Sequence, residues 1–216
     1  MFSLQIFLVS ITAGILGSIL GLGGGIIIIP VLTLVYKVDI EHAIGASIVA
    51  VIATSSGAAI AYIKDKVTNI RIGMFLEIAT TVGAITGAFI GGLLNSKYLF
   101  VIFSLLMLYS TFMMLKKSNT ELPNNVVQDP LADKLNLHGE YYDKSLKEDV
   151  KYNVSGVKSG FGIMYFAGIM SGLLGIGSGS FKVMAMDVFM KLPMKVSSST
   201  SNFMIGVTAA ASAGVY

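Results

Sequence analysis

Two glycine-rich segments are the first feature of this sequence whose residues could bind a ligand. They read GLGGG over 21–25 and GIGSG over 175–179, an offset of 154 residues. Glycine permits sharp turns. Such a turn leaves N–H groups free at the start of the next helix, where the helix dipole favours an anion. The alternative is close helix packing through small residues. The candidate anion-binding residues of the motifs are Gly23, Gly24, Gly25, Gly177, Ser178 and Gly179.

Polar side chains that follow each motif form a second candidate group. Ser47 follows the first motif, Ser201 and Asn202 follow the second, and the two serines are again 154 residues apart. Hydroxyl and amide groups can donate hydrogen bonds to an oxyanion without adding charge. The alternative is that each side chain bonds to its own helix or to a neighbouring one. We expect all three residues to line the anion site.

Three ionisable residues lie inside apolar segments, where charged groups are costly and point to function. Lys182 comes just after the second motif, at the position that Ile28 holds after the first. We predict that Lys182 supplies positive charge to a small anion; the alternative is a side chain that extends to the membrane surface. Glu77 and Asp187 are candidates for binding a coupling ion, for which we expect a proton, or for an ion pair with Lys182.

The composition excludes several classes of function. The 216 residues include no cysteine and two histidines, His42 and His138, which lie far apart, so no metal site or other cofactor is expected. The formal net charge of +3 is small and spread out, unlike that of a nucleic-acid-binding protein. No Ser/His/Asp set or paired-carboxylate site can be assembled. We therefore expect neither an enzyme nor a nucleic-acid partner.

Hydrophobicity predicts an integral membrane protein. Hydrophobic residues make up 54% of the chain and charged residues 12%, and 14 of the 27 charged residues lie within 116–158. Apolar runs of about 18 or more residues elsewhere indicate membrane-spanning helices. We expect an all-α, multi-pass protein of the cytoplasmic membrane, with the lipid bilayer as its partner. The first apolar segment, 3–36, would be about 50 Å long as one helix, against a hydrocarbon core of about 30 Å. We therefore expect it to break at its glycine motif.

An internal repeat organises the chain. When 12–62 is aligned with 166–216 without gaps, 12 of 51 pairs are identical. Repeats with broken helices are typical of secondary transporters, which bind their substrate where the repeats meet. We predict a first transmembrane repeat over 1–115, a cytoplasmic polar loop over 116–158 and an incomplete second repeat over 159–216. The second repeat stops about 53 residues short, which favours a chain truncated at its C-terminus.

The orientation of the repeats and the content of the loop follow less directly. Lys191 and Lys195 favour the cytoplasm, which favours inverted rather than parallel repeats. The polar loop is long for a segment without structure, so we expect a tolerated insertion with a short surface helix or partial disorder. In the first repeat, Gly83, Gly87 and Gly91 recur every four residues, a pattern that predicts close helix packing.

The paired motifs resemble the sulfite exporter TauE/SafE family of permeases. The residues that carry the resemblance are the two glycine motifs, Pro30, Ala43, Gly45-Ala46-Ser47 and Ser199-Thr200-Ser201. The family implies export of sulfite, a sulfonate or a related sulfur-containing anion, coupled to an ion gradient. The chain departs from the usual pattern at Ser178, which replaces a glycine, and at Lys182, Met184 and Asp187, in a stretch that is normally apolar and ends in a proline. The alternative is a non-transporting membrane subunit that acts through the polar loop. The sequence does not give the oligomeric state.

Overall fold

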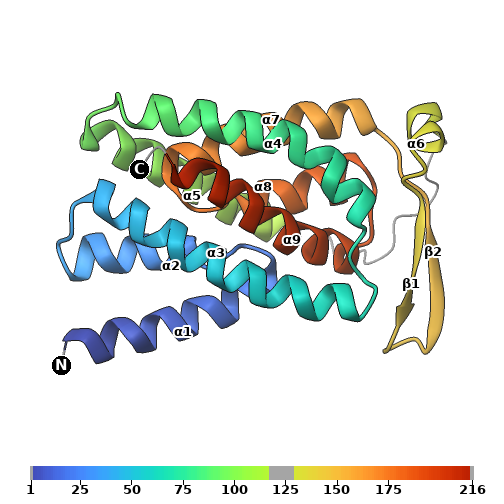
Figure 1. Ribbon diagram of the computed structural model, residues 1–216, viewed down its shortest axis with the longest axis horizontal. Coiled ribbons are helices and arrows are strands. Elements are labelled where there is room, and N and C mark those ends of the chain that lie inside the picture. The colour runs from blue at the N-terminus through green and yellow to red at the C-terminus, as the bar shows by residue number, and fades with distance from the viewer. Residues whose placement is uncertain (1, 117–128, 215–216) are drawn as a thin grey trace.

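The computed structural model describes residues 2–116 and 129–214, in which helices run along one common axis and a small hairpin covers one end (Figure 1). In the first part of the chain the elements are α1 (Phe2–Leu20), α2 (Gly25–Pro30), the π-helical turn η1 (Val31–Val35), α3 (Ile40–Lys64), α4 (Ile70–Gly91) and α5 (Ser96–Lys116). In the second part they are α6 (Pro130–Lys134), β1 (Gly139–Asp143), β2 (Glu148–Tyr152), α7 (Val157–Leu174), α8 (Gly179–Met184), the π-helical turn η2 (Ala185–Phe189) and α9 (Met194–Ala213).

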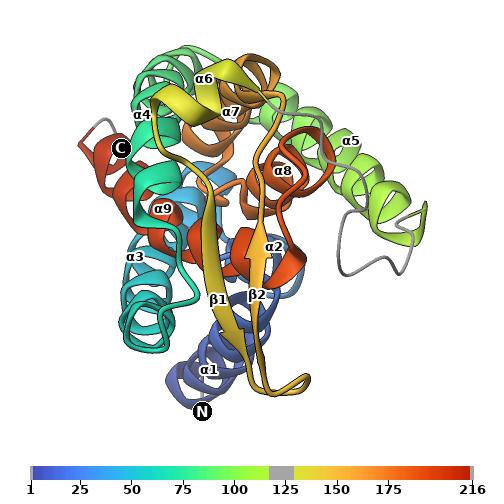
Figure 2. The ribbon, with the colours of Figure 1, turned by 90° about the vertical axis from the view of Figure 1, so that its right-hand side faces the viewer.

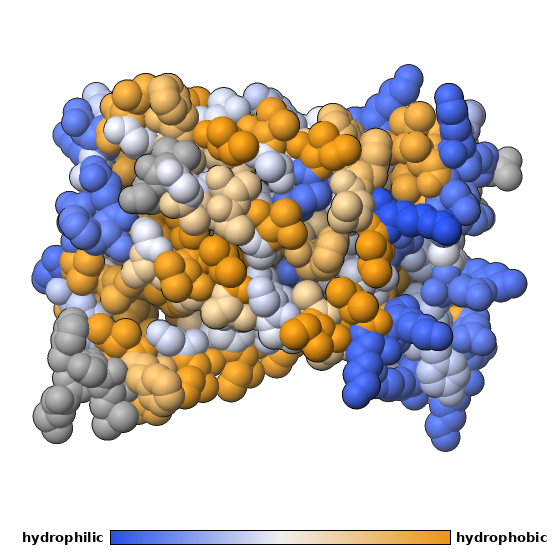
Figure 3. Space-filling model, viewed as in Figure 1, coloured by the Kyte–Doolittle hydropathy of each residue, from blue (hydrophilic) through white to orange (hydrophobic). Residues whose placement is uncertain are grey.

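The outer surface of the helices is apolar over a broad band. Within the described residues, three helices, α3, α4 and α7, are long and apolar enough to cross a membrane. Large side chains on them face outward, among them Val49 (68% exposed), Ile60 (72%) and Phe89 (67%). Figure 3 shows this band between two polar ends. So much exposed apolar surface would be a liability in water, whereas lipid is its natural surrounding.

Polar residues start the long helices at the two ends of this band. Asp39 caps α3 by accepting a hydrogen bond from the amide of Glu41 at 2.9 Å. Asn69 caps α4 in the same way, with the amide of Ile72 at 3.1 Å. Such caps satisfy N–H groups that the helix itself leaves unpaired. The caps stand at opposite ends of the bundle, because α4 begins where α3 finishes (Figure 1).

The two glycine motifs occupy the same kind of position in the chain. The first lies between α1 and α2, and the second lies between α7 and α8. After each motif come a helix of six residues, a π-helical turn of five and a long helix. Figure 1 shows that the chain reverses direction at each motif, and that α1 and α7 run in opposite directions.

Helices α4 and α7 pack against each other at backbone distance. A Cβ added to Gly83 would lie 2.3 Å from the carbonyl oxygen of Tyr165, and one added to Gly87 would lie 2.0 Å from that of Ile169. The reverse also holds, because a Cβ on Gly172 would lie 1.9 Å from the carbonyl oxygen of Ala84. The predicted packing role of Gly83 and Gly87 is therefore confirmed.

The polar loop contains β structure, so the prediction of an all-α chain is wrong there. β1 and β2 form an antiparallel hairpin that lies across one end of the helices (Figure 2). Tyr141, Val150 and Tyr152 alternate with exposed residues and point inward, where they join a core that includes Ile72 and Met190. Alternation of this kind buries one face of a strand. The predicted short surface helix is present as α6.

Hydrogen bonds and ion pairs attach the hairpin to both parts of the chain. Lys144 pairs with Asp65, at the end of α3, at 2.8 Å. Its neighbour Asp143 pairs with Lys195, at the start of α9, also at 2.8 Å. The hydrogen bond from Lys195 lowers the pKa of the Asp143 carboxyl group below its usual value. Two consecutive residues of the hairpin therefore bind one residue before the loop and one residue after it.

Candidate functional site

The two glycine turns follow matching backbone paths. Gly21, Gly23 and Gly24 have φ angles of 70°, 76° and 82°. The residues 154 positions later, Gly175, Gly177 and Ser178, have φ angles of 62°, 72° and 45°. Positive φ is uncommon for residues with a side chain, so Ser178 holds a backbone conformation that glycine adopts more easily. Both turns therefore have positive φ at the same three positions, although the fourth positions differ in ψ, which is −17° at Gly24 and 30° at Ser178.

The turns touch each other, and two serines connect them. Ser47 Oγ donates a hydrogen bond to the carbonyl oxygen of Gly175 at 2.9 Å. Ser201 Oγ donates to the carbonyl oxygen of Gly21 at 3.0 Å, with a longer contact of 3.5 Å to that of Gly179. A hydroxyl has one proton to donate. In this arrangement the protons of both serines are engaged by backbone carbonyls rather than available to an oxyanion.

The last glycine of each motif marks the closest approach. A Cβ on Gly25 would lie 2.6 Å from Ser47 Oγ and 2.9 Å from the Cα of Ile176. A Cβ on Gly179 would lie 2.1 Å from the carbonyl oxygen of Gly21 and 2.6 Å from the Cα of Leu22. Each motif therefore needs a residue without a side chain at its fifth position, because the other motif occupies that space.

Apolar side chains face the middle of both turns. A Cβ on Gly23 would lie 3.0 Å from Ile205 Cγ2 and 3.2 Å from Val51 Cγ1. A Cβ on Gly177 would meet the same two atoms at 2.8 Å and 3.2 Å. Val51 and Ile205 are themselves 154 residues apart. We call the place where the two glycine turns, 21–25 and 175–179, contact each other the crossing. Its centre is thus packed with side chains in this structure.

Two further predicted residues lie beside the crossing. Asn202 Nδ2 donates to the carbonyl oxygen of Ser18 at 2.7 Å, whereas its Oδ1 is buried and has no hydrogen-bond partner among the described residues. Ser178 is fully buried, and its hydroxyl likewise has no partner in the described part of the chain. A buried polar group without a partner carries a free-energy penalty. Ser171, four residues before the second motif, is buried with a hydroxyl that also has no partner among the described residues, so both serines hold unused donors beside the second turn.

Lys182 and Glu77 are brought together through a third residue. Lys182 is fully buried, one helical turn after Ser178, whose carbonyl accepts its amide hydrogen bond at 3.1 Å. Its Nζ donates to Thr208 Oγ1 on α9. Thr208 Oγ1 donates to Glu77 Oε1 on α4 at 2.6 Å. Thr81 also donates to Oε1, at 3.1 Å. Three elements therefore meet at a chain of polar atoms with a positive group at one end and a negative group at the other.

Lys182 and Glu77 are the buried charged residues among the described helices that form the apolar band. Glu77 is 7% exposed, and the remaining buried charged residue, Asp143, lies in the hairpin and pairs with Lys195. Isolated charges in a low-dielectric interior are costly, and an opposite charge nearby offsets that cost. Glu77 Oε2 has no hydrogen-bond partner in the described part of the chain. The group is thus neutral overall and has one unused carboxylate oxygen.

Sequence reasoning missed Thr208. For Asp187 it gave only the spacing of five residues after Lys182, which does not place the two side chains directly above one another on a helix. Thr208 matches Thr54 at the same offset of 154 residues, so the repeat contained a signal for it. Asp187 lies half-buried on η2, five residues after Lys182. No cluster of three or more metal-ligating side chains occurs within 2–116 and 129–214.

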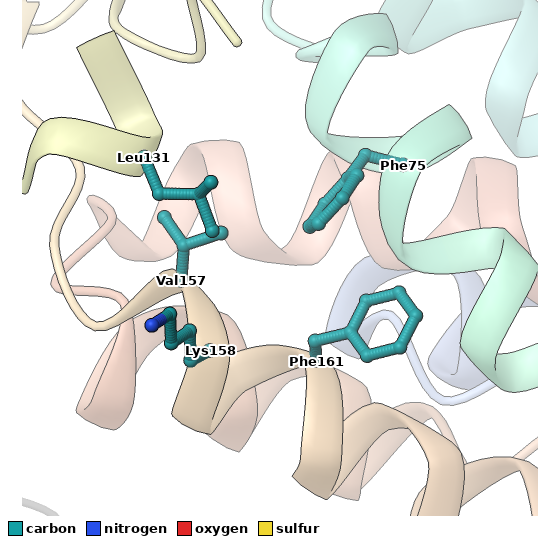
Figure 4. A pocket seen from close by; sticks show the side chains of 5 residues that line it. All are labelled: Phe75, Leu131, Val157, Lys158 and Phe161. Atoms are coloured by element: carbon teal, nitrogen blue, oxygen red, sulfur yellow. The ribbon is translucent and has the colours of Figure 1, made fainter. Parts of the chain in front are cut away.

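A surface pocket lies apart from these residues. It has a volume of about 270 Å³ and is lined by Phe75, Leu131, Val157, Lys158 and Phe161, where α4, α6 and α7 meet (Figure 4). Its walls are almost entirely apolar, and none of the predicted site residues lines it. The candidate site is therefore the buried crossing with its charged pair, and not this pocket.

The apolar band, the crossed turns and the buried charges belong to a membrane protein, and comparison with known proteins gives its class: a membrane transporter, not an enzyme. The chain belongs to the sulfite exporter TauE/SafE family, whose model matches residues 6–216. A relative from Bacillus subtilis (strain 168), named "Probable membrane transporter protein YunE", is 32% identical over 200 residues, which cover 89% of this chain and 70% of that protein. No solved structure matches the chain.

Proposed function

We propose that this protein is a secondary transporter that exports a small anion, such as sulfite, a sulfonate or a related sulfur-containing oxyanion, across the cytoplasmic membrane. Membership of a family named for sulfite export supports the substrate class. The observation that carries the proposal is the fully buried Lys182, one helical turn from the unpartnered hydroxyl of Ser178. An ammonium and a hydroxyl donor that are both removed from water are suited to an oxyanion.

The proposal gives the glycine turns a structural and a functional role. They are the breaks of two homologous repeats, 1–115 and 159–216, that run in opposite directions and cross at the midplane. Unwound backbone is tolerated at that depth only where protein or a watery cavity surrounds it. In the closed arrangement Ser47 and Ser201 hold the two turns together. When the halves separate, backbone N–H groups of Gly24, Gly25 and Gly177 to Gly179 become available to the anion, whereas the N–H of Gly23 stays bonded to the carbonyl oxygen of Gly17 at 3.2 Å.

The test is thermal stabilisation of the purified protein in detergent by sulfite, sulfate, thiosulfate, small sulfonates and carboxylates. A ligand that binds the folded state raises Tm in a concentration-dependent way. We expect a shift from a sulfur oxyanion that disappears in Lys182→Met. The matched control is Lys158→Met, which removes an exposed lysine and should keep the full shift. A shift retained in Lys182→Met would contradict the role of Lys182, and no shift from any anion would favour a cationic or neutral substrate.

A further inference from the structure

We propose that Glu77 is the proton-binding group of this transporter, and that a bound anion replaces its carboxylate as the counter-charge of Lys182. The inference rests on the proposed function and adds how the site keeps its charge balanced when an anion binds. Its basis is the continuous polar chain Lys182–Thr208–Glu77, which links a buried cation to a buried anion across α8, α9 and α4.

Charge balance requires Glu77 to become protonated when an anion replaces it as the counter-charge of Lys182. Without substrate, the ammonium of Lys182 and the carboxylate of Glu77 sum to zero. A monoanion that binds beside Lys182 would leave a net charge of −1 in a region from which water is excluded, which is costly. Uptake of one proton by Glu77 restores neutrality. An O–H bond forms on the carboxylate, the proton comes from the water on the side where the anion enters, and no other covalent bond changes.

The hydrogen bonds around the pair fit this exchange. An ammonium has three N–H donors, and Thr208 is the acceptor found for Lys182 among the described residues. Two donors therefore remain for an anion. Glu77 receives hydrogen bonds on Oε1 from Thr208 and Thr81, while Oε2 has no partner in the described part of the chain. Oε2 can take up the proton without breaking either existing bond.

Other titratable groups on the surrounding elements are poorly placed for this role. They are Glu41, His42, Tyr62 and Lys64 on α3, Arg71 on α4, Lys97, Tyr98 and Tyr109 on α5, Lys158 and Tyr165 on α7, Asp187 on η2 and Lys195 on α9. All except Tyr62 and Asp187 are exposed, Tyr62 donates to the carbonyl oxygen of Ser18 at 3.4 Å, and Lys195 pairs with Asp143. Asp187 is half-buried and is the acid nearest to Lys182 in the chain, so Asp187→Asn is the matched control for Glu77→Gln.

The experiment counts protons that are taken up when an anion binds. Calorimetric titrations of the full chain in two buffers with different heats of ionisation give this number directly. Methanesulfonate is the principal probe because it stays a monoanion throughout the working pH range, whereas sulfite titrates near neutral pH and serves as a second probe. In the wild-type protein we expect about one proton per anion, and a Kd that weakens about tenfold for each unit of pH increase above the pKa of the proton-binding group.

The variants decide which group takes up the proton. Glu77→Gln should bind the anion without proton uptake and with a Kd that does not change with pH, whereas Asp187→Asn should behave as the wild type does. In infrared difference spectra, anion addition should produce a carboxylic acid C=O band that Glu77→Gln lacks. Wild-type binding without proton uptake would overturn the coupling while leaving the proposed function intact, as would unchanged uptake in Glu77→Gln. No binding of either probe to any form would overturn the proposed function and the coupling with it.

Discussion

The hydroxyl of Ser47 donates a hydrogen bond to the carbonyl oxygen of Gly175, across a sequence separation of 128 residues. The repeat partner of Ser47 is Ser201, 154 residues later, and the repeat partner of Gly175 is Gly21, 154 residues earlier. Ser201 and Gly21 form the same bond. Each half therefore holds the glycine turn of the other half. A two-fold relation between the halves requires such a reciprocal pair of bonds.

The reciprocal bonds predict a stability loss when either serine is removed. Ser47→Ala and Ser201→Ala should each lower the free energy of unfolding by about 1–3 kcal/mol, because each leaves a buried carbonyl without its partner. The control is Ser104→Ala, which removes an exposed hydroxyl bonded only within its own helix. Denaturation in detergent measures the difference. A loss no larger than that of the control would contradict the role of these bonds.

Gly179 should be intolerant of any side chain. Its added Cβ would lie 2.1 Å from the carbonyl oxygen of Gly21, and backbone there cannot move without separating the turns. We expect Gly179→Ala to destabilise the protein by at least about 1–3 kcal/mol. Gly162→Ala is the control, because nothing lies within 4 Å of its added Cβ and alanine favours a helix. Melting temperatures of the two variants test the comparison, and equal values would refute it.

The buried pair predicts strong coupling between two substitutions. Lys182→Met or Glu77→Gln alone leaves an uncompensated buried charge and should cost about 3–5 kcal/mol, whereas the double variant should be much closer to wild type. A double-mutant cycle measures the interaction. Losses that simply add would show that the two groups do not compensate each other. Methanesulfonate should restore part of the stability of Glu77→Gln, since it supplies the missing negative charge.

The hairpin should detach at low pH. The pKa of Asp143 is lowered in the folded state, chiefly by the hydrogen bond from Lys195. The stabilisation is therefore fully present above the unfolded value of about 3.9 and is lost as the pH falls through the lower folded value. Hydrogen exchange of the hairpin amides should report this loss. Lys195→Met should shift the transition to higher pH, whereas Lys151→Met, at an exposed position of the same hairpin, should not.

Most of the residues that the sequence singles out lie close together in the structure, whereas the structure of the loop differs from the prediction. The repeat offset pointed to the glycine turns and to Ser47 and Ser201, because matched positions stand out even in an apolar background. It did not give the acceptors of the serines, since a hydrogen bond over more than 100 residues depends on how the halves pack. The hairpin was missed because Tyr141, Val150 and Tyr152 are its few inward-facing residues among many charges.

Thr208 shows a different limit. Its match with Thr54 is visible, but threonine in a membrane helix ordinarily bonds back to its own turn. The carbonyl oxygen of Met204, 2.9 Å from Thr208 Oγ1, is such an acceptor and competes with Glu77 for the one proton of this hydroxyl. Its second role appears only when Lys182 and Glu77 are brought to either side of it. Ionisable residues could be predicted singly from their cost in an apolar segment, whereas the residue between them could not.

The backbone contact between α4 and α7 determines which parts of the molecule can move separately. With carbonyl oxygens filling the space above Gly83, Gly87 and Gly172, neither helix can slide past the other without a collision. We expect the two helices to travel as one rigid block, although α4 precedes the polar loop and α7 follows it. The mechanical units of this transporter therefore do not coincide with the halves of its sequence, and its hinges must be sought inside each half.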